Sequence, residues 1–154
     1  MVSRTVIIEA IRKAAAEALG VESLSEAGNG PELQDQPREF GAYKVGECER
    51  IEDPASVGLA VLDQPVLIPI DFYYVRQRAM GSEAMGQVRD RLDALSEALG
   101  DAGPVRSAWR EGLPVVWSHV TSFGEGGSDE YGHVFLSGDN NWCAGHVSVE
   151  VLCA

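Results

Sequence analysis

The amino-acid sequence predicts a single α+β domain, in which a mostly antiparallel sheet is covered by two helices. Two segments place apolar residues at helical spacing, and each is followed by segments whose apolar and polar residues alternate as in strands. The resulting order of helix, strands, helix and strands is typical of this fold class. A length of 154 residues and an apolar content of 45% agree with one globular domain over residues 1–154.

The first helix is expected over residues 5–19. Ser3 or Thr5 can cap its first turn, and Gly20 follows its last residue. Its apolar face is formed by residues three or four apart: Ile8, Ile11, Ala15, Ala18 and Leu19. A long polar loop, residues 22–41, is expected next, and loops of this length are usually functional.

Three strands are expected between the helices, over residues 43–48, 57–62 and 66–78. The last is the clearest, because five apolar side chains alternate onto one face: Val66, Ile68, Ile70, Phe72 and Tyr74. Its other face is still half apolar, so we expect that face to meet another surface. Pro69 cannot donate a backbone hydrogen bond, which predicts an edge position or a break in the strand.

The second helix is expected over residues 82–99, with Ser82 as N-cap and Gly100 at its end. Arg89 and Asp93 lie four residues apart on its flank. Its apolar stripe should pack across the strand face that contains Ile68 and Phe72. The stripe has regular spacing: Met85, Val88, Leu92, Leu95 and Leu99.

The last third of the chain has the pattern of strands throughout. Residues 115–123 and 131–136 are expected to form a hairpin, with a glycine-rich acidic tip at about residues 124–130. A final strand is expected over residues 146–153. Its inward side chains are Val147, Val149 and Val151.

The charge of the chain is strongly negative, with a formal net value of −12. This argues against nonspecific nucleic-acid binding and against docking on anionic membranes. All 12 basic residues lie at or before Arg110, and six acids follow without a base. A second acidic segment, residues 22–63, holds ten acids and three bases. Such surfaces are either simply solvated or suited to a polyanion that passes close by without binding.

No catalytic, cofactor-binding or metal-binding motif is present. The glycine cluster at 124–127 lacks the Lys-Ser/Thr of a phosphate loop, and no dinucleotide fingerprint or nucleophile elbow occurs. Cys143 and His146 form a lone Cys-x-x-His pair, too little for a zinc site. We expect His119 to share one face of its strand with Trp117 and Phe123. His119 and His133 are both predicted to be partly buried structural residues.

The three cysteines, Cys48, Cys143 and Cys153, are expected to remain free, unmetallated thiols. No apolar stretch reaches the roughly 18 residues of a transmembrane helix. Arg12 and Lys13 interrupt what would be the apolar part of a signal peptide, so we expect an intracellular chain.

The order of segments resembles the tail terminator (tail completion) proteins of long-tailed bacteriophages. The resemblance rests on an amphipathic helix, a long polar loop, a strand ending in Arg76-Gln77-Arg78 that leads into a leucine-rich helix, and a strand-rich tail ending at 146–151. Residues 65–99, about a quarter of the chain, are the most similar part. The family has a small α/β fold and forms a ring, typically a hexamer, at the head end of the tail tube.

The resemblance implies a non-enzymatic virion protein, assembled in the host cytoplasm and located in the tail or neck. Its partners would be further copies of itself, the tail tube protein and the head–tail connector proteins, and DNA would pass through the ring without specific binding. The alternatives are a tail-tube or head–tail joining protein, a small cytosolic metal-dependent enzyme, or an adaptor that binds peptide strands. A ring needs surfaces that bind neighbouring subunits, for which the candidates are Leu67, Tyr73 and Val75. It also needs an acidic passage, for which the candidates are Glu125, Asp129 and Glu130.

Overall fold

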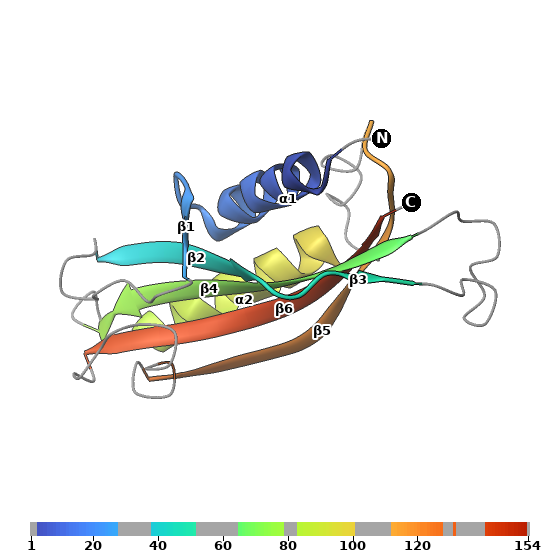
Figure 1. Ribbon diagram of the computed structural model, residues 1–154. Helices are drawn as coiled ribbons and strands as arrows, with labels where there is room; N and C mark the ends of the chain where they lie inside the picture. Colours follow the sequence, from blue (N-terminus) through green and yellow to red (C-terminus); the bar gives the residue numbers. More distant parts are fainter. Residues whose placement is uncertain are drawn as a thin grey trace.

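The computed structural model describes residues 3–27, 38–51, 65–78, 83–100, 112–127, 131 and 141–153. It confirms a small α+β fold with two helices and a six-stranded sheet (Figure 1). The elements along the chain are α1 (Arg4–Leu19), β1 (Leu24–Glu26), β2 (Glu39–Val45), β3 (Glu49–Arg50), β4 (Val66–Gln77), α2 (Ala84–Leu99), β5 (Val115–Gly127) and β6 (Trp142–Cys153).

The sheet has the order β1-β2-β4-β6-β5, and the short β3 pairs with β4 beyond the end of β2. Every pair is antiparallel except β1 with β2. The long strands β4, β6 and β5 lie side by side in Figure 1. The mostly antiparallel sheet is therefore as predicted, although the predicted pairing of individual strands is not.

Both helices cover the same face of the sheet and share one apolar core. The predicted face of β4 lies in this core, and the stripe of α2 packs on it through Val88, Leu92, Leu95 and Leu99. On α1 the buried face is shifted from the prediction: Ile7 is buried, whereas Ile8 and Ala18 are only half-buried. The buried residues of α1 are Ile7, Ile11, Ala15, Ala16 and Leu19.

The ends of α1 follow the sequence signals, and those of α2 do so only in part. Ser3 accepts a hydrogen bond from the Val6 N–H, and Gly20 adopts the left-handed conformation with φ of 69°. The N-cap of α2 is Glu83, without a side-chain bond, so the prediction of Ser82 as cap was wrong; Ser82 itself lies outside the described residues. Gly100 has φ of −72°, but an added Cβ would lie 2.7 Å from the Ser96 carbonyl oxygen.

Pro69 lies inside a central strand, so the prediction of an edge or a break at this residue was wrong. Its carbonyl accepts a hydrogen bond from the Gly46 N–H, which directs the Pro69 backbone toward β2 and β3 rather than toward β6. The connection from β2 to β3 has three residues, 46–48. The stretch of β4 that lies opposite this connection has only two residues, Ile68 and Pro69. This irregularity accommodates the missing N–H without disturbing the ladder to β6.

The predicted turn at residues 124–127 was wrong, and the expected partner strand, residues 131–136, lies outside the described residues except for Tyr131. β5 continues to Gly127, and its partner is β6, with Gly124 opposite His146 and Glu125 opposite Gly145. Residues 124–127, with their three glycines, therefore belong to a strand and not to a tip; residues 128–130 lie outside the described part of the chain. β6 supplies the hydrogen-bonding partner that a glycine-rich strand needs.

The remaining predicted loop and strands are confirmed only in part. The loop predicted over residues 22–41 contains β1 and the start of β2, while residues 28–37 are not described. The strand expected at 43–48 begins earlier, at Glu39, and ends at Val45. The strand expected at 57–62 falls outside the described residues. The final strand is confirmed and extends back to Trp142, with Val147, Val149 and Val151 buried on the helix-covered face.

Candidate interaction surface

The second face of β4 is covered within the chain itself. Tyr73 is 6% exposed and Val75 is fully buried, so neither is free to contact a neighbouring subunit and both predicted interface roles are corrected. Phe40 and Trp142 pack edge to face there, with ring centroids 5.9 Å apart. The members of this second core are Ala27, Phe40, Ala42, Tyr73, Val75, Tyr131, Trp142 and Ala144.

Beyond Tyr73 the same face becomes more polar and more open. Leu67 and Asp71 are half-buried, and the Ser148 hydroxyl donates to Asp71 across the strand pair at 2.6 Å. Leu67 remains the one predicted apolar interface residue of β4 that retains substantial exposure, at the end of the strand that pairs with β3.

An aromatic cluster closes the second core near the middle of the sheet. The Tyr131 hydroxyl and His146 Nδ1 are 3.0 Å apart, and the Tyr73 and Tyr131 rings are 6.2 Å apart. Burial, with the Asp71 carboxylate and Tyr131 adding to it, raises the pKa of Tyr73 to about 12. A Cβ on Gly124 would lie 2.9 Å from His146, so the glycine makes room for the imidazole beside Tyr131. His146 is held in a packed cluster.

The lone Cys-x-x-His pair cannot bind one metal ion. Cys143 points into the helix-covered core, whereas His146 points to the opposite face, because side chains three residues apart on a strand alternate sides. Across the described ranges, no group of three or more His, Cys, Asp or Glu side chains is placed to hold an ion. The three cysteines are free thiols, and burial followed by the proximity of Cys48 raises the pKa of Cys153 to about 11.

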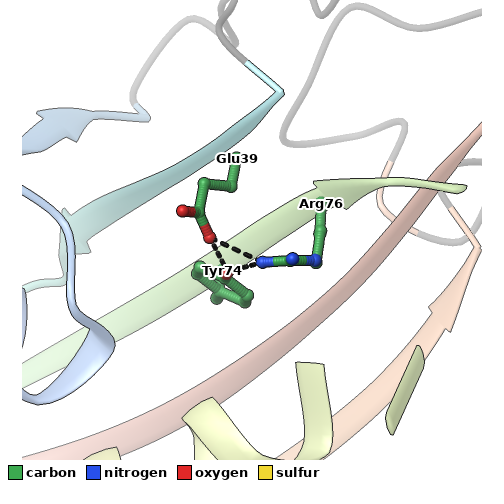
Figure 2. Close-up of polar contacts among 3 residues, drawn as sticks. All are labelled: Glu39, Tyr74 and Arg76. Atoms are coloured by element: carbon green, nitrogen blue, oxygen red, sulfur yellow. Dashed lines mark hydrogen bonds and ion pairs between the residues drawn. The ribbon is translucent and has the colours of Figure 1, made fainter. Parts of the chain in front are cut away.

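A polar triad joins the start of β2 to the end of β4 on the helix-covered face. Figure 2 shows Glu39, Tyr74 and Arg76 converging. The Tyr74 hydroxyl donates to Glu39, and Arg76 Nη1 donates to Glu39 at 2.8 Å and to the Tyr74 oxygen at 3.1 Å. Burial, and then the bond to Glu39, raise the pKa of Tyr74. The triad satisfies its own charges, apart from a buried Arg76 Nε without a hydrogen-bond partner, and it stabilises the strand pair.

β5 differs from the other long strands because it is the last strand of the described sheet. Phe123 lies opposite Val147, on the helix-covered side, yet 72% of its surface is exposed. Glu125, two residues on, accepts from Arg89 Nε of α2 at 2.6 Å, and its carboxylate raises the pKa of Arg89. Phe123 is thus the most exposed large apolar side chain of the described residues, and it lies on an outer strand.

Two irregularities in β5 determine which way its side chains point. The register to β6 shifts between Val115 and Trp117 and again between Val120 and Ser122. The second shift sends His119 and Phe123 to opposite faces, so the expected common face was wrong for Phe123, whereas His119 does share a face with Trp117. His119 is exposed rather than partly buried, and its ring lies 4.2 Å from that of Trp117. Ser118, on the other face, is buried and donates to the Leu99 carbonyl.

The acidic interface candidates are only partly described. Glu125 lies on β5, bound to Arg89, and not on a projecting tip as predicted. Asp129, Glu130 and His133 lie outside the described residues. Sequence reasoning missed the aromatic cluster and the triad, because each joins residues far apart in the sequence: Tyr73, Tyr131 and His146 in the cluster, and Glu39 with Tyr74 and Arg76 in the triad.

A scan against protein-family models found no match to this chain, and no curated protein is significantly similar to it in sequence. Neither described helix has the length and apolar character needed to cross a membrane.

Proposed function

We propose that this protein is a non-enzymatic, ring-forming subunit of a virion, a tail terminator that caps the tail tube where it meets the head. The copies would form a closed ring, with six as the expected number. A tail-tube or head–tail joining subunit would use the same surfaces.

One observation supports this proposal most strongly: the sheet ends in a thirteen-residue strand with an exposed aromatic side chain. The outer edge of β5 pairs with no other described strand, and Phe123 projects beside that edge. Exposed sheet edges bind further strands through backbone hydrogen bonds, and exposed apolar side chains mark contact sites. A subunit that joins its neighbours would use both features.

The charge of the chain supports the passage of DNA through such a ring. With a net charge of −12 and no basic residue after Arg110, much of the surface repels a polyanion. A ring that lets DNA pass must not retain it, and acidic residues around the opening would meet this need.

The test begins with the mass and shape of the purified protein. Light scattering should give about six times the 16.5 kDa subunit mass, and negative-stain images should show rings. A chain that stays monomeric at high concentration, and that binds no tail or connector protein, contradicts the proposal.

A charge reversal tests the acidic passage separately. Replacing Asp129 and Glu130 together with lysine should let the ring retain duplex DNA at low salt, because new phosphate contacts release counterions. A matched control replaces two exposed acids on the helices, Glu17 and Asp93, with lysine. Equal retention by both variants would show that the change in net charge, and not the position of these acids, is responsible.

A further inference from the structure

We infer that the outer edge of β5, over residues 122–127, accepts β1 of a neighbouring copy as an antiparallel strand. This inference rests on the proposed ring and specifies the contact that would build it. It follows from three properties of the described chain: an unprotected edge, the directions of the two outermost strands, and the positions of their charges.

The segment 122–127 lacks the features that normally protect an outer strand. Proteins block exposed edges with bulges, proline or charged side chains that face an incoming strand. Both irregularities of β5 lie before Ser122, and the segment contains three glycines and no proline or lysine. Its one charged residue, Glu125, is bound to Arg89 of its own α2. Within the described part of the chain, the edge is therefore open where Phe123 projects.

The directions of the strands make another copy of this chain a suitable occupant. β1 runs parallel to β2, and each further step across β4, β6 and β5 is antiparallel. The two outermost strands, β1 and β5, therefore run in opposite directions. When copies stand side by side in one orientation, as in a ring, β5 meets the neighbour's β1 as an antiparallel pair.

The acidic residues select the register of this pair. Opposite residues share a face, and Phe123, Glu125, Leu24 and Glu26 all lie on the helix-covered side of their strands. Placing Glu125 opposite Glu26 sets like charges together, and placing Phe123 opposite Leu24 brings Glu125 level with Glu22. Phe123 opposite Glu26, with Glu125 opposite Leu24, keeps the carboxylates apart.

An edge variant tests the use of β5. Phe123→Glu should abolish the ring and leave a 16.5 kDa monomer with unchanged circular dichroism, because it adds a carboxylate opposite Glu26 of the neighbouring copy. Val6→Glu is the matched control, since Val6 is another exposed apolar residue (50%) but lies on α1. The control should assemble like the wild type.

Cross-linking tests the register. The double variant Phe123→Cys with Glu26→Cys should form intermolecular disulfides under mild oxidation, up to a closed covalent ring on a non-reducing gel. Ser122→Cys with Ser25→Cys, which matches the rejected register, should not. The single variants show any background from Cys48, Cys143 and Cys153.

The outcomes separate this inference from the proposed function. A wild type that never assembles overturns both. Rings that survive Phe123→Glu, or that cross-link only through the 122/25 pair, overturn the proposed pairing and leave the ring itself standing. Loss of the ring in Phe123→Glu alone, together with cross-linking through the 123/26 pair, supports it.

Discussion

β4 and β5 flank the same strand, β6, and have nearly the same length, twelve and thirteen residues, yet their surroundings differ completely. β4 is buried on both faces through most of its second half, from Phe72 to Val75. Of the β5 residues whose burial is described, 115–126, only Ser118 is buried, and Phe123 is the most exposed large apolar residue described. Pairing along almost the whole of β6 does not make a strand a core strand; a neighbour on each side and a layer on each face do.

The irregularities of the two strands show the same difference. β4 contains Pro69, but its ladder to β6 is continuous, and the compensating extra residue lies in the neighbouring β2–β3 connection. β5 has its own register shifts, which no further described strand constrains. An outer strand can bend around an extra residue, whereas a central strand transfers the adjustment to its neighbours.

The largest expected effect is on the core beneath β4. Leu92→Ala should lower the free energy of unfolding by about 2–5 kcal/mol, because Leu92 is 3% exposed and its truncation leaves a cavity between α2 and the sheet. Urea denaturation measures the change. Phe123→Ala on β5 is the control and should change the stability of the isolated subunit by less than about 0.5 kcal/mol. Similar losses in both variants would remove the distinction between the two strands.

High pH should destabilise the protein through β4. The pKa of Tyr73 is raised to about 12, so the neutral phenol is favoured in the folded chain. The neutral Tyr73 phenol contributes fully to the free energy of unfolding below pH 10. This contribution, about 2–3 kcal/mol in total, is lost as the pH rises from about 10 to about 12. Urea denaturation at intervals across this range should show a steeper loss for the wild type than for Tyr73→Phe. The raised pKa of Cys153 acts in the same direction and stays in both proteins.

Alanine substitutions at two glycines, one in α2 and one packed against it, should change the stability in opposite directions. An added Cβ at Gly145 of β6 would overlap Leu92 and lie 3.0 Å from Val88, so Gly145→Ala should cost about 1–3 kcal/mol. Gly86, inside α2, has no atom within 4 Å of an added Cβ, and Gly86→Ala should stabilise by about 1 kcal/mol. Thermal unfolding of the two variants should therefore shift to opposite sides of the wild type.

The smallest expected change in the free energy of unfolding concerns two ion pairs, one that joins β4 to β2 and one that joins β5 to α2. Glu39→Gln should cost about 1–2 kcal/mol, because Arg76 is 15% exposed and loses a charged partner. Glu125→Gln should leave the unfolding free energy unchanged within error, because Arg89 is 59% exposed and remains hydrated. A larger loss for Glu125→Gln would show that the β5 pair contributes more than solvent screening allows.

The sequence by itself determined the fold class, the two helices, the helix-covered face of β4 and the inward valines of β6. Each is encoded locally, since a periodicity of 3.6 or 2 residues specifies both the element and its buried side. The stripe of α2 from Val88 to Leu99 and the alternation from Ile68 to Tyr74 needed no knowledge of their partners.

Only the tertiary structure decided which strands pair and what covers the second face of the sheet. Residues 124–127, three of them glycines, have the local pattern of a turn, and they form a strand because β6, which begins at Trp142, pairs with them. Tyr73 and Val75 alternate like interface residues, but Phe40, Tyr131 and Trp142 cover them within the chain. The strand pairing and the packing over the second face depend on residues far apart in the sequence, so a local pattern cannot specify them. These long-range contacts make β4 a core strand and leave β5 as the outer strand.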